Sequence, residues 1–302
     1  MSQPDSGGKK EPILVIGSNG QLAHAIRSLH EVWGDNFSMI FASSAELDIR
    51  DELQVMHFIE IHQPAVIINC AAYTNVDRAE DEADEAMLLN ATAAGYLAKA
   101  SSAIGAIMVH VSTDYVFNGL SEYPYTEEDV VGPLSVYGMS KQRGEQLVRE
   151  NCAQHYIVRT SWLYSNHGNN FLNTMLRLAQ EKKELSIVTD QIASPTWAGD
   201  LSKGLYDLLK KALIDTADIP FGTWHFTNHG EASWFDFAAA IFSMTEKQMV
   251  IHPANALSYP TKANRPYYSK LNCEKWETKM GAIPHWKVSL LKCLNERRLQ
   301  MS

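Results

Sequence analysis

The 302-residue chain lacks several features that mark whole classes of proteins. It has no basic run, and its formal net charge of −9 argues against nucleic acid, whose phosphates require a Lys/Arg surface. No apolar run approaches the roughly 20 residues of a membrane-spanning helix. The opening segment MSQPDSGGKKEP has no apolar core, so it predicts a flexible leader (residues 1–11) and no signal peptide.

Cysteine is scarce as well. The four cysteines, Cys70, Cys152, Cys273 and Cys293, are scattered and show no C-x-x-C spacing. This pattern predicts free thiols in a reducing cytoplasm, with neither a disulfide framework nor a metal site. His110 stands alone in an apolar segment, so we expect a hydrogen-bonded core residue there and no ligand.

What the chain does have is a regular alternation of two patterns. Short apolar segments, rich in β-branched residues, predict strands at residues 13–17, 37–42, 65–69, 106–112 and 156–161. Segments with helical spacing separate them, at residues 21–30, 51–62, 84–104 and 135–151. This order predicts an α/β fold with a Rossmann-type, doubly wound parallel sheet and right-handed crossovers.

The alternation loosens after Trp162. We expect helices at 171–181 and 200–212 and strands at 185–188 and 222–228, followed by a proline-containing segment with short helices at 229–302. These elements predict a smaller C-terminal α/β substrate-binding domain built from residues 162–196 and 229–302. Residues 12–161, with returning segments near 197–228, form the predicted dinucleotide-binding domain.

A glycine-rich turn joins the first expected strand to the first helix. Gly17 permits a tight turn, and Gly20 lets the backbone approach a pyrophosphate closely. Ala23 falls where a third small residue lets the helix pack on the strand, and the helix start offers N–H groups to phosphates. The cofactor-binding candidates of this turn are Gly17, Asn19, Gly20, Gln21 and Leu22.

The end of the second strand bears on the choice of cofactor. An acidic residue there would bond the ribose 2′-hydroxyl and favour NAD. This chain has Ser43 and Ser44 at that point, and no acid before Glu46. The serines can donate to a 2′-phosphate, but no arginine accompanies them, so we predict a mild preference for NADPH, with NADH also used.

Tyr137 and Lys141 are four residues apart in the segment VYGMSK. On a helix this spacing places both side chains on one face, one turn apart. A lysine ammonium beside the phenol would lower the tyrosine pKa and make it a better acid or base near neutral pH. An exposed pair on a solvated helix face has the same spacing, so the pair alone does not identify a site.

Further motifs connect these pieces. The turn Gly17-x-x-Gly20, NCAAYT (69–74), STDYVF (112–117) and YGMSK (137–141) occur in this order, and together they resemble the extended short-chain dehydrogenases/reductases. RTSWLY, GNNF, DQIASPT and NRPYYSKLN narrow the resemblance to the dTDP-4-dehydrorhamnose reductase family. The resemblance runs from about Ile13 to the last helix.

The resemblance implies NADPH-dependent reduction of the C4 keto group of dTDP-4-dehydro-L-rhamnose, with Thr113, Tyr137 and Lys141 as the catalytic residues. Tyr137 would give a proton to the C4 oxygen, Thr113 would orient that oxygen, and Lys141 would bind the nicotinamide ribose. It also implies cofactor contacts from Asp48, Ile49, Ala71, Ala72 and Tyr73, in addition to Ser43 and Ser44. The implied substrate contacts are Thr113, Asp114, Trp162, Asn169, Asn170, Gln191 and Arg265.

Two departures from the family pattern bear on packing and metal binding. Ala23 replaces the usual third glycine, a small change that the turn should tolerate. Some members carry a glutamate on the first helix that helps to bind Mg²⁺ at a dimer contact, whereas this chain has Ala25. We therefore predict no metal, and the choice between monomer and homodimer stays open.

Two other functions remain as alternatives. The same fold and triad would serve a reductase or epimerase of another nucleotide-sugar, because only the pocket would differ. A non-catalytic NADP-binding regulatory subunit is a second alternative. The intact set of Thr113, Tyr137 and Lys141 argues against it, because a binding module has no need of them.

Overall fold

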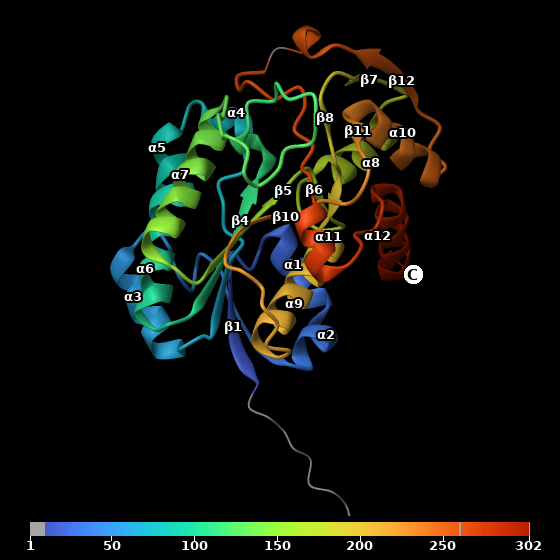
Figure 1. Cartoon of the computed structure of the whole chain (residues 1–302). Helices are drawn as coiled ribbons and strands as arrows, with labels where there is room; N and C mark the ends of the chain where they lie inside the picture. Colours follow the sequence, from blue (N-terminus) through green and yellow to red (C-terminus); the bar gives the residue numbers. More distant parts are fainter. Residues whose placement is uncertain (1–9, 260, 302) are drawn as a thin grey trace, which may run out of the picture.

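The computed structural model describes residues 10–259 and 261–301, and a parallel six-stranded sheet lies at its centre (Figure 1). The sheet order is β10-β5-β4-β3-β1-β2, and every neighbouring pair is parallel. The strands are β1 (Glu11–Ile16), β2 (Phe37–Ala42), β3 (Val66–Asn69), β4 (Ile107–Thr113), β5 (His155–Thr160) and β10 (Gly222–His225). The predicted doubly wound parallel sheet is confirmed. The predicted leader lies outside the described residues, apart from Lys10 and Glu11, the first residue of β1.

The strand order reverses between β1 and β3. From β1 the chain steps to the edge strand β2 on one side, then returns past β1 to β3 and continues outward. The carboxyl ends of β1 and β3 diverge at this switch point, where open α/β sheets bind their ligands. The glycine-rich turn follows β1 directly and therefore lies at this position.

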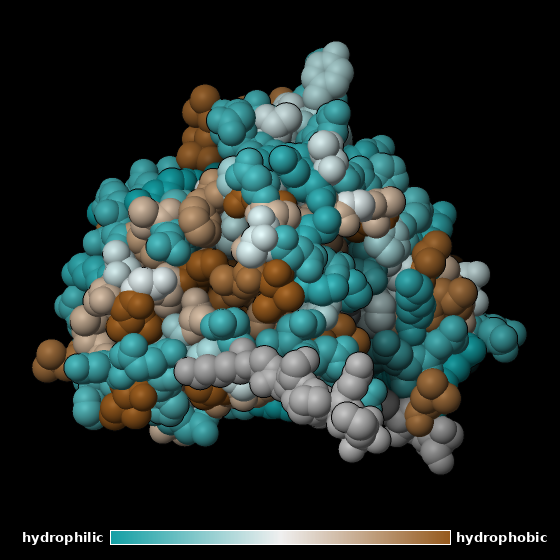
Figure 2. Space-filling view, turned by 60° about the horizontal axis from the view of Figure 1, so that its bottom comes forward, coloured by the Kyte–Doolittle hydropathy of each residue, from teal (hydrophilic) through white to brown (hydrophobic). Residues whose placement is uncertain are grey.

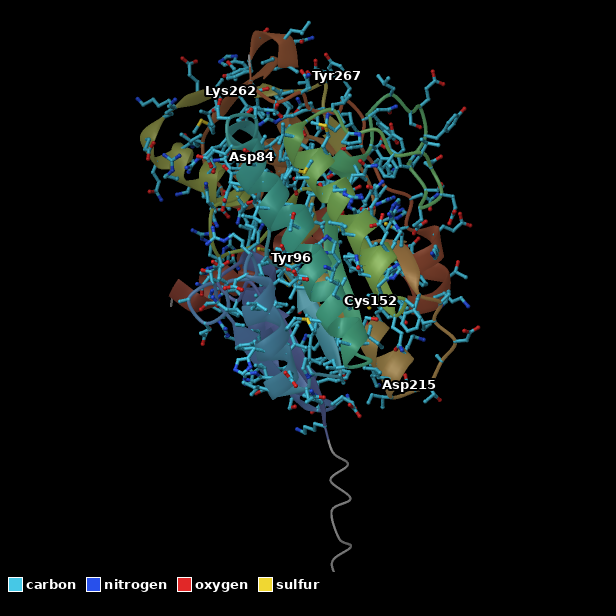
Figure 3. The ribbon with its side chains drawn as sticks, turned by 90° about the vertical axis from the view of Figure 1, so that its left-hand side faces the viewer. Asp84, Tyr96, Cys152, Asp215, Lys262 and Tyr267 are labelled. Atoms are coloured by element: carbon cyan, nitrogen blue, oxygen red, sulfur yellow. The ribbon has the colours of Figure 1, made fainter. Side chains whose placement is uncertain are left out.

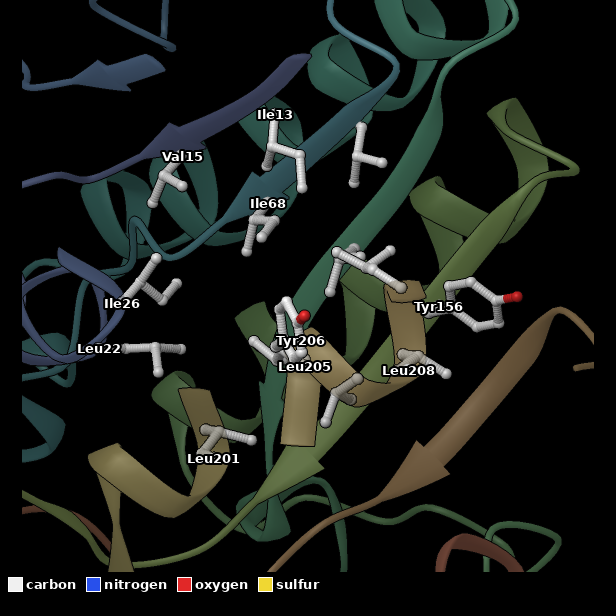
Figure 4. Close-up of a cluster of buried hydrophobic side chains, with 14 of the residues drawn as sticks. Ile13, Val15, Leu22, Ile26, Ile68, Tyr156, Leu201, Leu205, Tyr206 and Leu208 are labelled. Atoms are coloured by element: carbon white, nitrogen blue, oxygen red, sulfur yellow. The ribbon is translucent and has the colours of Figure 1, made fainter. Parts of the chain in front are cut away.

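Helices cover both faces of the sheet (Figure 1). One face packs against α1 (Gln21–Ser28), α2 (His30–Gly34), α9 (Ala198–Leu213) and α11 (Glu274–Met280). Figure 4 shows part of that cluster, in which Leu22 and Ile26 of α1 and Leu201 and Leu205 of α9 meet Ile13 and Val15 of β1. Each such side chain contributes about 1.5–3 kcal/mol by leaving water.

The other face packs against α3 (Glu52–His62), α6 (Ala93–Ala103) and α7 (Val136–Asn151). The predicted helix at 84–104 is present as α5 (Ala83–Met87), a π-helical turn (Leu88–Thr92) and α6 in direct succession. A Cβ on Gly144 would lie 2.2 Å from the Asn90 carbonyl oxygen of that turn. This close approach fixes the position of α7 relative to the π-helical turn. The short helix α4 (Val76–Ala79) was not predicted.

A second lobe is built around two parallel strands, β7 (Glu184–Val188) and β12 (Val250–Ala254). Three helices share its apolar core: α8 (Phe171–Glu181), α10 (Trp234–Met244) and α12 (Trp286–Met301). Two-residue strands complete it: β6 (Leu163–Tyr164) with β9 (Thr196–Trp197), and β8 (Ile192–Ala193) with β11 (Ala232–Ser233).

The second lobe contains elements that were not expected, among them its four two-residue strands. β12 was missed because Pro253 argues against a strand, and α12 is a long helix where only short ones were expected. The proposed division into domains remains a prediction. Within it, α11 falls in segment 229–302 yet inserts Trp276 into the core beneath the sheet.

The two ends of the molecule differ. Lys262 and Tyr267 lie at the end marked by Asp84 and far from Asp215 (Figure 3). Ala263 bonds Asp77 and Ser269 bonds Asp114, so residues 263–269 lie against the segments that follow β3 and β4. The opposite end, where the chain enters β1, is mostly hydrophilic with apolar groups distributed over it (Figure 2). In the described part of the chain, every helix is too short or too polar to cross a membrane.

Candidate active site

Three cavities open at the carboxyl edge of the sheet. The turn cavity, about 410 Å³, is lined by Gly17, Gly20 and Ala71 among others, and the triad cavity, about 540 Å³, contains Tyr137 and Lys141. These two share four lining residues and so form one continuous cleft: Asn19, Gly20, Cys70 and Ala72. The outer cavity, about 640 Å³, lies between the second lobe and residues 256–259 and 261–267.

The glycine turn is fixed by backbone contacts. Gly17 has φ +77°, and a Cβ there would lie 2.7 Å from the Ala71 nitrogen, so only glycine fits without displacing β3's end. Gly20 precedes α1, and no side chain among the described residues caps this helix start. Uncapped N–H groups facing the cleft suit an anionic pyrophosphate. The candidates Asn19, Gln21 and Leu22 also line the cleft.

The end of β2 is more charged than the sequence suggested. Ser43 donates from its backbone N–H and from its hydroxyl to Oε2 of Glu46, at 2.7 Å each, and these bonds lower the pKa of Glu46. The turn after β2 therefore brings the Glu46 carboxylate against Ser43. Arg50, held by Asp48 at 2.8 Å, also lines the turn cavity, so an arginine eight residues beyond β2 lies in the same cavity as Ser44.

The other cofactor candidates fall in two groups. Ser44, Asp48, Ile49, Ala71 and Ala72 line the turn cavity, as expected of cofactor contacts. Tyr73 lines neither part of the cleft, and its hydroxyl instead donates to Glu82 at 2.6 Å. Its backbone N–H donates to Asn90, which ties the segment after β3 to the π-helical turn.

The three predicted catalytic residues meet in the triad cavity. Thr113 ends β4, and Tyr137 and Lys141 lie on α7, whose start is capped by Ser135. A Cβ on Gly138 would lie 2.3 Å from the Tyr115 carbonyl oxygen, so α7 begins directly against the end of β4. The hydroxyls of Tyr137 and Thr113 consequently interact.

The electrostatics of this trio differ from the expectation. Burial raises the pKa of Tyr137 to about 12. Lys141 donates to the Val111 carbonyl at 2.7 Å, and the causes that shift the Tyr137 pKa do not include it. Burial also lowers the pKa of Lys141 to about 8. The prediction that Lys141 lowers the tyrosine pKa is therefore wrong for this structure, in which the tyrosine stays protonated at neutral pH and can donate a proton.

His110 is a buried core residue, as expected. Its ring contacts the Asn69 amide at 3.2 Å and the Lys141 amine at 3.3 Å, and burial lowers its pKa well below the ordinary value. The four cysteines are free thiols, also as expected. Among residues 10–259 and 261–301, no three His, Cys, Asp or Glu side chains gather as a metal site would require.

Asp114 lies behind Thr113 and is almost fully buried. The Ser269 hydroxyl donates to it at 2.5 Å and the Thr113 hydroxyl at 3.0 Å. Burial raises the pKa of Asp114 to about 7 despite these hydrogen bonds. Ser269 belongs to the second lobe's long C-terminal segment, so this carboxyl joins the segment to the end of β4.

Trp162 stands between the cleft and the outer cavity. It lines the triad cavity with a positive φ of 45° and stacks on Trp234 at a centroid distance of 3.5 Å. Trp234 lines the outer cavity with Phe171, and its indole N–H donates to Gln191 at 3.1 Å. The stacked pair thus forms an aromatic wall shared by both spaces.

The remaining substrate candidates are divided between the two spaces. Gln191 and Arg265 line the outer cavity, whereas Asn169 and Asn170 line the triad cavity. Asn170 caps α8 and donates to the Ser165 carbonyl at 2.9 Å, so much of its side chain serves local structure. Arg265 holds Asp77 of α4 through two bonds of 2.6 and 3.1 Å.

Thr160 is a residue that sequence reasoning missed. It ends β5, lines the triad cavity and is buried, yet its hydroxyl has no hydrogen-bond partner within the described part of the chain. Its place in RTSW was the available signal. An unpaired buried hydroxyl costs about 1–3 kcal/mol, so a bound polar group would relieve it. Together with the uncapped helix start, Thr160 suits a dinucleotide with an amide-bearing ring.

Comparisons with known proteins agree with this geometry. The family profile described as "RmlD substrate binding domain" matches residues 11–299. The chain is 39% identical to the dTDP-4-dehydrorhamnose reductase of Sinorhizobium fredii NGR234, covering 92% of this chain and 94% of that protein. It is 37% identical to the Escherichia coli K12 enzyme of the same name, covering 94% and 97%.

A solved structure is equally similar. The dTDP-4-dehydrorhamnose reductase of Bacillus anthracis, determined in complex with NADP, superposes with a TM-score of 0.90 at 38% identity, and 95% of this chain covers 100% of that one. The fold and family suggested by the motifs are confirmed. The roles of the individual site residues remain predictions.

Proposed function

The chain belongs to the RmlD substrate-binding-domain family, and we propose that it reduces the C4 keto group of dTDP-4-dehydro-L-rhamnose to give dTDP-L-rhamnose, with NADPH as cofactor and NADH as a second one. One observation carries this proposal. Thr113, Tyr137 and Lys141 line a single cavity, which continues into the cleft beside the glycine turn. An NAD(P)H oxidoreductase requires this combination of proton donor and dinucleotide site.

Each residue has a role that its contacts support. Bound NADPH supplies the hydride. Tyr137 is neutral at physiological pH, and burial raises its pKa further above that range, so it holds the proton that the developing C4 alkoxide needs. Thr113 interacts with the tyrosine hydroxyl and donates to Asp114, which fixes the direction of its own hydroxyl. Lys141 would bind the nicotinamide ribose.

The outer cavity would hold the dTDP moiety. Arg265 lines it, and a guanidinium pairs well with a pyrophosphate. The Trp162–Trp234 wall leads from this cavity to the triad, so the hexose would lie along it. Binding of the remote nucleotide would then align the sugar and convert binding energy into rate. We place the reaction in the cytoplasm, without a metal, in a monomer or homodimer.

The test is NADPH oxidation with dTDP-4-dehydro-L-rhamnose against other 4-keto nucleotide-sugars and a free 4-keto hexose. Turnover with the first substrate alone, and dTDP-L-rhamnose as the product identified by NMR, is the expected result. A clear preference for another nucleotide-sugar would make the protein a different reductase or an epimerase. Nucleotide binding without turnover on any sugar would indicate a regulatory subunit.

A further inference from the structure

A buried chain of polar groups runs behind the triad. His110 of β4 lies between Asn69 of β3, its register partner, and Lys141 of α7. His110 is 0% exposed, Asn69 1% and Lys141 2%. The carboxamide nitrogen of Asn69 is 3.2 Å from Nδ1 of His110, and Nε2 is 3.3 Å from Nζ of Lys141.

The positions of the protons in this series of polar groups can be assigned by starting from Asn69. The Ala71 backbone N–H donates to Oδ1 of Asn69 at 3.1 Å, so the oxygen of the amide is fixed and its NH₂ faces His110. Nδ1 of His110 must then accept, which leaves the ring proton on Nε2. That N–H faces Lys141. A neutral amine can accept it with its lone pair, whereas an ammonium has none.

We propose that Asn69 and His110 are positioning residues that hold Lys141 as a neutral amine against β4 and release it into the cleft when it takes up a proton. The functional part of this inference rests on the proposed function, in which Lys141 serves the nicotinamide ribose. Only the charged form would turn away from the His110 N–H toward Tyr137 and the cofactor. In the held form the amine also donates to the Val111 carbonyl of the same strand.

The surrounding charges agree with this assignment. Burial lowers the pKa of Lys141, opposed by Glu145 on the same helix and by Cys70 after β3. Burial, Lys141, Arg149 of α7 and His155 of β5 all lower the pKa of His110, which keeps the ring neutral. Glu145 itself is paired with Arg159 at 2.8 Å, so its charge is already shared.

The alternative assignment carries a specific cost. If Lys141 were an ammonium in this position, Nε2 would accept and Nδ1 would carry the proton. Asn69 would have to flip, and its NH₂ would then face the Ala71 N–H. The bond lost would be the one that fixes Ala71 against Gly17 at the switch point. The proton on Lys141 is thereby coupled to the backbone of the cofactor cleft.

The experiment measures the titration of Lys141 directly. Protein labelled with [ε-¹³C]lysine is titrated by NMR, and the Lys141 signal is assigned with Lys141→Arg. We expect a midpoint near pH 8 in the wild type. His110→Leu removes the facing N–H, so the midpoint should rise by about one pH unit. Met108→Leu, buried two residues earlier on β4, is the matched control and should leave the midpoint unchanged.

NADPH affinity provides a second readout. It should fall as the pH rises through the midpoint, and at pH 9 His110→Leu should bind NADPH about five-fold more tightly than wild type, because more of its Lys141 is charged. Asn69→Asp accepts from both Ala71 and His110, so the ring proton moves to Nδ1. Its Lys141 midpoint should rise as well, but the ammonium stays at His110 and the gain in affinity should be absent.

Three results would overturn the inference: a wild-type midpoint above 10, equal midpoints in wild type and His110→Leu, or no rise in Asn69→Asp. If His110→Leu does not fold, Asn69→Asp and the wild-type titration still decide. The NMR measurement needs no substrate. Absence of turnover on every sugar would therefore remove the proposed function while the measured midpoints still support or reject the lysine assignment.

Discussion

The turn cavity and the outer cavity are built by different means. The turn cavity is lined by residues 16–89, which follow β1, β2 and β3 in three consecutive βα connections. The outer cavity draws its walls from residues 134–267, and its aromatic wall and Arg265 are fixed by contacts far apart in the chain. One cavity is shaped by backbone turns, and the other by side chains that only the complete fold brings together.

The two cavities differ in how far their lining residues can be replaced without moving the backbone. A Cβ at Gly17 would collide with backbone at Ala71, so the turn cavity tolerates little change. Trp234, Tyr259 and Tyr267 of the outer cavity are side chains on helix and loop, and other residues could replace them without moving a strand. Under the proposed function, the turn cavity would serve as a dinucleotide site general to such sheets, whereas the outer cavity would decide which sugar nucleotide is bound.

The largest expected effect comes from a change in the triad cavity, at Tyr137. Tyr137→Phe keeps the ring and removes the proton donor, so kcat should fall by about 10² or more. Titrations should show near-normal affinity for both NADPH and the dTDP-sugar, because neither cavity loses a wall. Tyr164→Phe is the control, since that buried hydroxyl has no partner among the described residues, and it should keep full turnover. Normal turnover in Tyr137→Phe would remove the tyrosine from the mechanism.

Trp162→Ala should impair the reaction of the dTDP-sugar and leave NADPH binding unchanged. The variant loses the stack on Trp234, and we expect kcat/KM for the dTDP-sugar to fall by about 10- to 100-fold. The NADPH dissociation constant, measured by fluorescence titration, should stay the same. Trp162→Phe retains a flat ring and should recover part of the loss. Weaker NADPH binding in Trp162→Ala would instead assign the indole to the cofactor half of the cleft.

The same contrast explains what the sequence could predict. Gly17, Gly20 and Thr113 were found because strand, turn and helix are local patterns, and parallel strands end at one edge. Trp162 was found through its motif, but its partner Trp234 and the bond from Arg265 to Asp77 were not. The contacts of Lys141 were missed as well, because its partners His110 and Val111 lie 31 and 30 residues away in the chain. Residue spacing predicts which side chains share one face of a helix, but it does not predict which residues they contact in the folded protein.

Asp114 links the sheet to the second lobe, and its titration should make the stability of the protein depend on pH. Its pKa is raised to about 7, above the value near 3.9 of an unfolded chain, so the folded state binds the extra proton. This stabilisation is complete below about pH 4 and is lost as the pH rises through 7. Between pH 6 and pH 8 the free energy of unfolding should fall by about 1.4 kcal/mol from this group alone.

Asp114→Asn should remove that decrease. Urea unfolding at pH 6 and pH 8 measures it, and Glu128→Gln, an exposed carboxylate in the loop before α7, should behave like the wild type. Since Ser269 also bonds Asp114, the same variant should weaken the dTDP-sugar complex more than the NADPH complex. Equal pH dependence in wild type and Asp114→Asn would mean that the carboxyl is already ionised at pH 6.

The smallest expected effect concerns the turn cavity alone. Glu46 is held by Ser43, the neighbour of the cavity-lining Ser44, so under the proposed function its charge would lie near the ribose 2′-substituent. Glu46→Gln keeps an acceptor for Ser43 and removes the charge, and the ratio of kcat/KM for NADPH over NADH should rise about two- to five-fold. Ser43→Asp should shift the ratio toward NADH. Both shifts should shrink at higher salt, because the carboxylate is exposed.

Glu60→Gln, on the exposed side of α3, is the matched control and should not alter the ratio. Steady-state kinetics with both cofactors is sufficient, and the dTDP-sugar KM should be the same in all three variants, because the outer cavity lies elsewhere. A ratio that stays constant in Glu46→Gln would leave Arg50 as the charged group that reads the 2′-position. Arg50→Gln should then lower NADPH use selectively, since this guanidinium lines the same cavity.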